Sequence, residues 1–173
     1  MRVLVTTASR HSSTAELGAA VARVLRLRGI DTVELLPGEV WDLSDYDAVV
    51  LGSAVYAGRW LPAAVSFVNR LGPQLTTRPV WLFSSGPVGD PPLPAQGPDV
   101  TRIVAGTRAV DHRVLAGRLD ADSLGFVARA MVRVMKAPSG DFRNWAEVAD
   151  FATEIADNLM GPNMVLSSGP YGR

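Results

Sequence analysis

Three short segments of this chain consist almost wholly of apolar and β-branched residues, and each of them runs into small and polar residues. They span residues 3–6, 48–51 and 80–83. Strands buried on both faces of a sheet have this unbroken character, whereas edge strands carry interleaved polar residues. Two further segments, 32–36 and 111–116, show the interrupted pattern. The sequence therefore predicts five strands, of which three are central.

Segments with apolar residues three or four apart separate these strands and predict helices. They cover residues 13–28, 62–71, 100–105, 124–135 and 145–160. Gly72 and Pro73 are expected to close the second helix, and residues 90–99, which contain four prolines, are expected to form an irregular loop.

Strands that alternate with helices build a parallel sheet with helices on both faces, an α/β three-layer sandwich. The first, third and fourth strands are the continuous ones, which fits the doubly wound order 2-1-3-4-5. We expect residues 1–160 to form this single domain and residues 161–173 to be a mobile tail.

Composition excludes several classes of protein. The chain has 173 residues, no cysteine, and 17 basic against 17 acidic side chains. Disulfides and thiolate metal sites are therefore absent, and no broad basic field predicts a nucleic-acid partner. No apolar stretch reaches the roughly 18–20 residues of a membrane span. We expect a cytoplasmic protein and no bound metal, while peripheral membrane contact and oligomeric state stay open.

The turn after the first strand has the chemistry of a phosphate cradle. Hydroxyl side chains crowd residues 7–14, and a helix is predicted to begin near Ser13. The first turn of a helix has backbone N–H groups without intrahelical partners, and the macrodipole adds positive charge there. Serine and threonine are also ordinary helix caps, so this loop alone does not establish an anion site.

Two more loops of small and polar residues follow the other central strands, at residues 52–60 and 84–90. In open α/β sheets ligands bind outside the carboxyl ends of the strands, near the point where the strand order reverses. Since the three strands are predicted neighbours, we expect the three loops to meet at one site.

With these motifs the chain resembles the flavodoxin domain family, in particular the branch of menaquinone-dependent protoporphyrinogen oxidases. The matching segments are residues 8–14, residues 46–58 continuing to Pro62, and residues 79–89. The likeness extends over nearly all of residues 1–160, and the second segment is the most specific. It implies a flavodoxin-like fold and a flavoprotein that binds FMN.

The resemblance also assigns residues to the cofactor. A first set would surround the 5′-phosphate: Ser9, Arg10, His11, Ser12, Ser13 and Thr14. A second set would run along one side of the isoalloxazine: Ser53, Ala54, Val55, Tyr56, Ala57 and Gly58. A third set would meet the other side and the pyrimidine edge: Ser85, Gly86, Pro87, Val88 and Gly89. Tyr56 is expected to contact the ring, while Trp60 can either stack on it or anchor its own helix.

Two residues depart from the pattern of the family. Ser12 stands where relatives commonly have glycine, so a left-handed backbone there costs roughly 1 kcal/mol or more. Pro87 has no N–H to offer the flavin edge.

The leading functional interpretation is an FMN-dependent oxidoreductase, protoporphyrinogen oxidase-like or quinone reductase-like. It would pass electrons from a reductant such as protoporphyrinogen to a quinone-type or other small acceptor. The flavin performs the redox chemistry, so no catalytic side chain is assigned. Arg10, Arg59, His11 and His112 are candidates for binding an anionic or quinone substrate, although such side chains near loops are more often solvated. His112, early in a predicted edge strand, is expected to be structural or exposed and not catalytic.

Two alternatives stay open: an electron-transfer flavodoxin that acts between protein partners, and a flavin-free binding module that has lost the cofactor. Electron carriers of this type are usually acidic around the flavin, which the balanced charge does not favour. Ser12 and Pro87 favour the flavin-free module. A phosphoacceptor domain, a dinucleotide-binding G-x-G-x-x-G and an esterase G-x-S-x-G are not supported by the loops.

Overall fold

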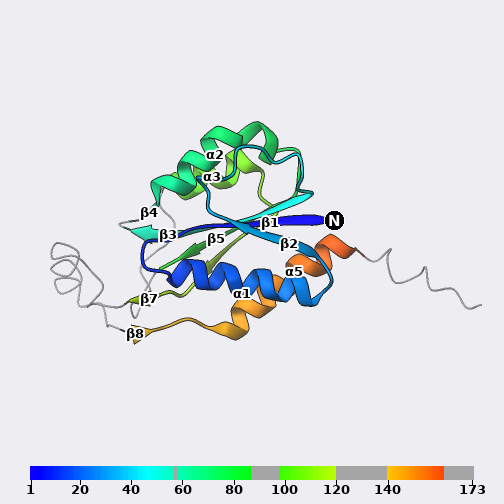
Figure 1. The fold of residues 1–173 in the computed structure, drawn as a ribbon. Helices are drawn as coiled ribbons and strands as arrows, with labels where there is room; N and C mark the ends of the chain where they lie inside the picture. The colour runs from blue at the N-terminus through cyan, green and yellow to red at the C-terminus, as the bar shows by residue number, and fades with distance from the viewer. Residues whose placement is uncertain (57, 87–97, 120–139, 162–173) are drawn as a thin grey trace, which may run out of the picture.

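The computed structural model describes residues 1–56, 58–86, 98–119 and 140–161, and it has one main sheet with helices on both faces (Figure 1). Five parallel strands lie in the order β2-β1-β3-β5-β6. Their bounds are β1 Arg2–Ala8, β2 Asp31–Leu35, β3 Ala48–Tyr56, β5 Val80–Ser85 and β6 Asp111–Leu115. These are the five predicted strands in the predicted order, with the interrupted ones at the edges.

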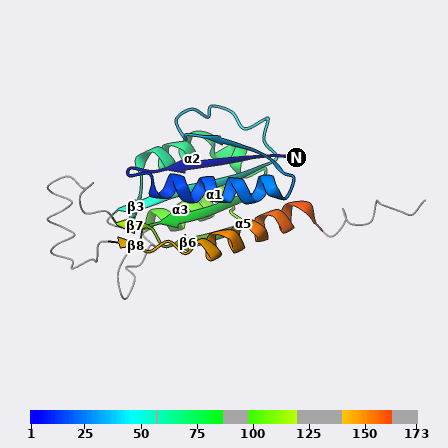
Figure 2. The same cartoon turned by 60° about the horizontal axis from the view of Figure 1, so that its bottom comes forward.

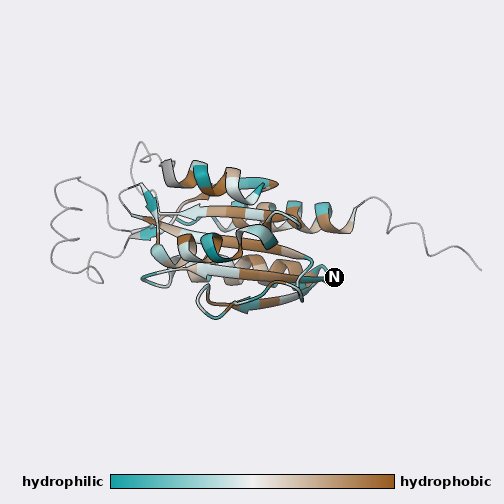
Figure 3. Cartoon of the chain, turned by 90° about the horizontal axis from the view of Figure 1, so that it is seen from above, coloured by the Kyte–Doolittle hydropathy of each residue, from teal (hydrophilic) through white to brown (hydrophobic). Residues whose placement is uncertain are grey.

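Helices α2 and α3 cover one face of the sheet and α1 and α5 cover the other, so the molecule has three layers (Figures 1 and 2). Their bounds are α1 Ser13–Leu27, α2 Pro62–Leu75, α3 Pro98–Thr107 and α5 Trp145–Met160. Apolar side chains of the sheet alternate between two buried clusters, one under each helix layer. The apolar colouring of the central strands in Figure 3 follows from this burial on both faces.

Two helices differ from the predicted bounds. Helix α2 does not close at Gly72 and Pro73 but continues to Leu75, whose side chain is fully buried. The burial of Leu75 outweighs the hydrogen bond that a proline removes near the helix end. Helix α3 begins at Pro98, inside the predicted loop, because the first turn of a helix tolerates a proline.

Some predictions fall on residues that the structure does not describe. The helix expected over 124–135, most of the proline-rich loop and residues 162–173 of the expected tail lie outside the described residues.

Central strands β3 and β5 extend further than the sequence indicates. Ser53, Ala54, Val55 and Tyr56 belong to β3, and Ser84 and Ser85 belong to β5, although all were predicted in loops. The hydroxyls of Ser53 and Ser84 are fully buried and hydrogen-bonded inside the protein. A short polar side chain with its hydrogen bonds satisfied can therefore stay within a buried strand.

Three strands of two residues each were not predicted. Strand β4 (Arg59–Trp60) pairs antiparallel with the end of β3, and β7 (Arg118–Leu119) pairs antiparallel with β8 (Gly140–Asp141). Segments this short have no hydrophobic period that a sequence can display. All three lie at the end of the sheet where the central strands finish (Figure 1).

Among the helices that the structure describes, none is both long and apolar enough to cross a membrane.

Candidate functional site

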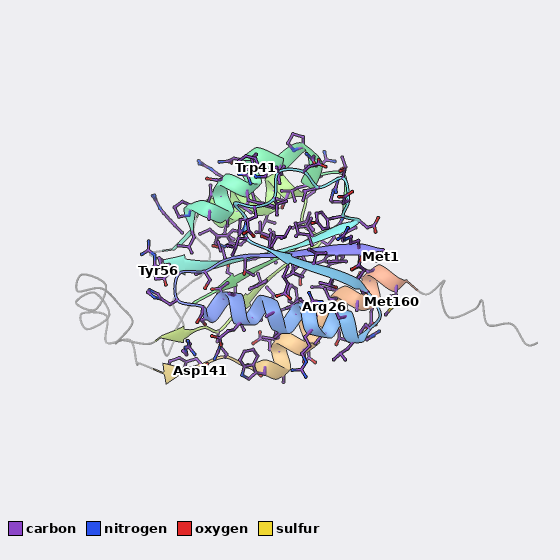
Figure 4. All side chains as sticks on the ribbon, viewed as in Figure 1. Met1, Arg26, Trp41, Tyr56, Asp141 and Met160 are labelled. Atoms are coloured by element: carbon purple, nitrogen blue, oxygen red, sulfur yellow. The ribbon has the colours of Figure 1, made fainter. Side chains whose placement is uncertain are left out.

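The carboxyl ends of β1, β3 and β5 lie side by side at one end of the sheet. Ala8 pairs with Ser53, and Ala54 pairs with Ser85. Helix α1 begins at this end, and β4, β7 and β8 surround it (Figure 1). The described parts of the three predicted loops are thus brought together. In Figure 4, Tyr56 and Asp141 mark this end, opposite Met1 and Met160.

The first loop connects β1 to α1 through a left-handed turn at Ser12. Its φ and ψ angles are 60° and −26°, and Ser12 is the N-cap of α1 without a side-chain cap hydrogen bond. The Ser12 hydroxyl instead donates to Glu16 Oε1 at 3.0 Å. The next two hydroxyl residues, Ser13 and Thr14, are buried in the first turn of the helix. A left-handed residue before a helix start turns successive N–H groups toward one point, which suits an anion.

The positive φ at Ser12 shows that a non-glycine residue takes the left-handed conformation there, for which a cost is expected. Ser12→Gly is expected to raise the free energy of unfolding by about 0.5–1 kcal/mol, because glycine removes most of the left-handed strain while the exposed hydroxyl contributes little. Thermal or urea unfolding without added cofactor measures this gain.

Arg108→Gly is the matched control for Ser12→Gly. Arg108 also has a positive φ, 52°, and follows helix α3. It should give a similar gain in stability. A loss of stability in Ser12→Gly together with a gain in Arg108→Gly would contradict the strain argument.

The second segment is a tight hairpin between β3 and β4. Val55 pairs with Trp60 and Tyr56 pairs with Arg59, and Gly58 takes a φ of 73° in the turn. Tyr56 is 37% exposed, and the guanidinium carbon of Arg10 lies 5.4 Å from its ring centroid. The first loop and the hairpin therefore meet through this cation–π contact. Ala57, also predicted to bind the cofactor, lies outside the described residues.

Trp60 anchors the hairpin in the core and does not face solvent. It is 3% exposed, and its Nε1 donates to Ser84 Oγ at 2.8 Å. Ser84 Oγ lies 2.8 Å from His112 Nε2 on edge strand β6. Of the two roles considered for Trp60, the structure favours the anchor. Ser53 Oγ adds a second attachment, since it accepts from Leu61 N at 3.0 Å.

His112 is half-buried, and burial lowers its pKa below the ordinary value of 6.5, while nearby Asp111 partly opposes this shift. The unfolded chain then binds the proton more readily than the folded one. The free energy of unfolding is therefore expected to fall as the pH is lowered from about 7.5 to about 5.5. His112→Gln should reduce this slope, measured by urea unfolding at several pH values.

His11→Gln removes the other histidine of the chain and is the matched control. A slope that survives in His112→Gln and disappears in His11→Gln would overturn the assignment.

The carboxylate of Asp141 acts in a different pH range. Its pKa is lowered to about 2, chiefly by a hydrogen bond from Arg143. The stability that this carboxylate contributes is therefore lost only below about pH 4, outside the range in which His112 titrates.

The third segment ends β5 with the buried Ser85 and with Gly86. Gly86 has a φ of 125°, and a Cβ built on it would lie 3.3 Å from the carbonyl oxygen of Val55. The backbone of β5 thus passes close to the end of β3 in a conformation that suits glycine. The other predicted residues of this loop, Pro87, Val88 and Gly89, lie outside the described residues.

A fourth segment, which the sequence analysis missed, reaches the same place from β6. Gly117 packs against Gly86, since a Cβ at Gly117 would lie 3.0 Å from Gly86 Cα. The next residue, Arg118, donates its backbone N–H to Ser13 Oγ at 3.0 Å, at the start of α1. The sequence signal that could have indicated this segment is the glycine directly after the fifth predicted strand, but many turns contain a glycine.

Arginine and carboxylate side chains surround the start of α1 beside this segment. Arg143 pairs with Glu16 and with Asp141, and its guanidinium carbon lies 4.6 Å from the ring centroid of Trp145. The side chain of Arg143 is only 6% exposed. A hydrogen bond from Arg143 is the main cause that lowers the pKa of Glu16, and a hydrogen bond from Ser12 is the second. Glu16 is therefore a carboxylate at neutral pH.

Hydroxyls, helix N-terminal N–H groups and arginine side chains form the donor set at this end of the sheet. These groups fit a phosphate monoester, which accepts several hydrogen bonds and is negatively charged. Within the described residues, no cluster of histidine, aspartate and glutamate could hold a metal ion.

Comparisons with known proteins agree with this geometry. A family model described as a flavodoxin domain matches residues 4–146. Protoporphyrinogen IX dehydrogenase [quinone] of Escherichia coli K12 is 25% identical over an alignment that covers 90% of this chain and 95% of that protein. A flavodoxin from the domain Archaea superposes with a TM-score of 0.64 at 15% identity, covering 93% of this chain and all of that one. A flavodoxin from Streptococcus pneumoniae superposes with a TM-score of 0.61 at 18% identity, covering 91% of this chain and 99% of that one.

Proposed function

Because the chain belongs to the flavodoxin domain family, we propose that it binds FMN at the carboxyl ends of β1, β3 and β5 and transfers electrons through it. The observation that carries this proposal is the left-handed turn at Ser12, directly before α1. The turn keeps its left-handed φ although a serine occupies the position, and a turn of this kind before a helix is suited to present N–H groups to a phosphate. When bound, FMN supplies the redox chemistry.

The residues of the chain would hold the two ends of FMN separately. Residues 9–14 would surround the phosphate, which suits their hydroxyls and the positive end of the helix dipole. The hairpin of β3 and β4 would lie along the isoalloxazine, with Tyr56 as the exposed aromatic residue. Because Trp60 and Ser53 fix this hairpin to the core, the ring would meet a preorganised surface.

For the reaction we propose oxidation of a reductant such as protoporphyrinogen with a quinone-type acceptor. Similarity to the protoporphyrinogen IX dehydrogenase [quinone] of Escherichia coli supports this reaction, as does the near-complete coverage of both chains. The equal numbers of acidic and basic residues support a small-molecule acceptor over a basic protein partner. The side chains of the site then serve to bind, to orient and to limit the access of water.

Two measurements test this function in sequence. The purified protein titrated with FMN should quench flavin fluorescence with a Kd of about 1 μM or lower. The loaded protein should then couple protoporphyrinogen oxidation to quinone reduction. Failure to bind FMN at millimolar concentration would overturn the proposal in favour of a flavin-free module. Tight FMN binding with reduction of a partner protein, and no quinone reduction, would favour the electron carrier.

A further inference from the structure

We infer that Arg118, which lies outside the loops that the family resemblance assigns, contacts the phosphate of the flavin and makes the site selective for the phosphorylated cofactor. This inference rests on the proposed FMN site. It concerns which residue supplies positive charge to the phosphate, and it therefore predicts a difference between FMN and riboflavin, which lacks the phosphate.

The backbone places Arg118 at the start of α1 independently of its side chain. Its N–H donates to Ser13 Oγ at 3.0 Å, which leaves the Ser13 hydroxyl proton free to be donated elsewhere. The preceding residue, Gly117, packs against Gly86 with no room for a Cβ. Pairing of β7 with β8, where Arg118 faces Asp141, holds the segment from the other side. Substitution of the Arg118 side chain should therefore leave this backbone arrangement intact.

A phosphate bound at the start of α1 would need a further cation beside it, because of the charges that already surround this end of the helix. Glu16 lies in the first turn of the helix, and its carboxylate would repel a phosphate at the helix start. Arg143 cannot move easily toward a phosphate, because it is buried and held by Glu16 and Asp141. Together these three residues carry one positive and two negative charges, so they do not favour an anion without a further cation.

Arg118 is positioned to supply that cation. Its Nη2 lies 3.4 Å from Ser12 Oγ and 3.7 Å from Glu16 Oε1, the upper range for a hydrogen bond and an ion pair. The side chain is 35% exposed, so it can rotate from Glu16 toward a ligand. Guanidinium groups bind phosphate through charge-assisted hydrogen bonds, often in pairs. The contact with Ser12 puts the guanidinium beside the left-handed turn.

The test compares Arg118→Gln with the wild type in fluorescence titrations with FMN and with riboflavin. Loss of a charge-assisted hydrogen bond should raise the Kd for FMN at least about tenfold. The Kd for riboflavin should change less than about twofold. Arg118→Lys, which keeps the charge but not the paired geometry, should raise the Kd for FMN by about threefold or less.

Arg23→Gln is the matched control, since Arg23 is an exposed arginine on the same helix. It lies ten residues beyond Ser13, roughly 15 Å along the axis, which exceeds the screening length of about 8 Å at physiological salt. It should leave both affinities unchanged. Circular dichroism and thermal unfolding of each variant would verify that the fold is retained.

The outcomes distinguish failure of this inference from failure of the proposed function. Tight FMN binding by the wild type with no selective loss in Arg118→Gln would overturn the role of Arg118 and leave the FMN site standing. A parallel loss for FMN and riboflavin would assign Arg118 to the general shape of the site and also overturn the inference. Binding of neither flavin by the wild type would overturn both proposals.

Discussion

Gly52→Ala is expected to lower the free energy of unfolding by about 3 kcal/mol, because the site has no room for a methyl group. A Cβ at Gly52 would lie 2.1 Å from Phe83 Cζ, and the two residues face each other on neighbouring strands β3 and β5. The ring of Phe83 cannot withdraw, since it is fully buried and packs edge-on against Phe151, with 6.3 Å between the two ring centroids. Urea unfolding of the variant and the wild type measures the difference.

Gly38→Ala is the control for Gly52→Ala. A Cβ at Gly38 would have no heavy atom within 4 Å, and no positive φ is recorded there. Its stability should stay within about 0.5 kcal/mol of the wild type. Phe83→Leu in the Gly52→Ala background should cost less than the sum of the two single changes, because a smaller side chain makes room for the new methyl group. Strict additivity would contradict the proposed clash.

Gly86→Ala is expected to cost about 2–3 kcal/mol of stability and to weaken FMN binding as well. Its φ of 125° is a conformation that only glycine adopts readily, and the new Cβ would lie 3.3 Å from the carbonyl oxygen of Val55. Relief of this strain would move the end of β5 away from the end of β3. The flavin ring is proposed to bind at these strand ends, so its binding surface would change. Unfolding measurements and an FMN titration of the same sample test both effects.

Gly106→Ala separates the site from a general effect of alanine. Gly106 lies inside α3 and is not followed by a proline, a Cβ there meets nothing within 4 Å, and alanine is the better helix former by roughly 1 kcal/mol. This variant should gain stability and keep its FMN affinity. Unchanged FMN affinity in Gly86→Ala would refute the proposed place of the third segment at the ring.

Which strands of the main sheet are central was predictable from burial, and the order followed when this pattern was fitted to the doubly wound arrangement. Strands with helices on both faces must be apolar throughout, and this requirement is visible in residues 3–6, 48–51 and 80–83. Helix α5 was predicted with the observed bounds, Trp145–Met160, because its buried residues recur at helical spacing. A left-handed residue before α1 was raised only as a condition, on the resemblance and not from the local pattern: if the position needs a positive φ, Ser12 is strained.

The details of the site were less predictable, because they depend on contacts between distant segments. Nothing near Arg118 in the sequence distinguishes it from the other basic residues, and its place follows from the packing of Gly117 on Gly86. Likewise, Ser53 and Ser84 resemble loop residues until their buried partners, Leu61 and His112, are known. Direct contact of residues 9–14, 53–58 and 85–89 with the cofactor stays a prediction.

The antiparallel pairing of β7 and β8 has a consequence for engineering of this protein. Residues 120–139 connect the two strands of this pair, and the residues that flank them, Leu119 and Gly140, are partners in the pairing. Antiparallel partners can be joined by a turn of two residues. The stem formed by β7 and β8 is therefore a natural junction, at which the intervening segment can be excised or exchanged without breaking any strand of the parallel sheet.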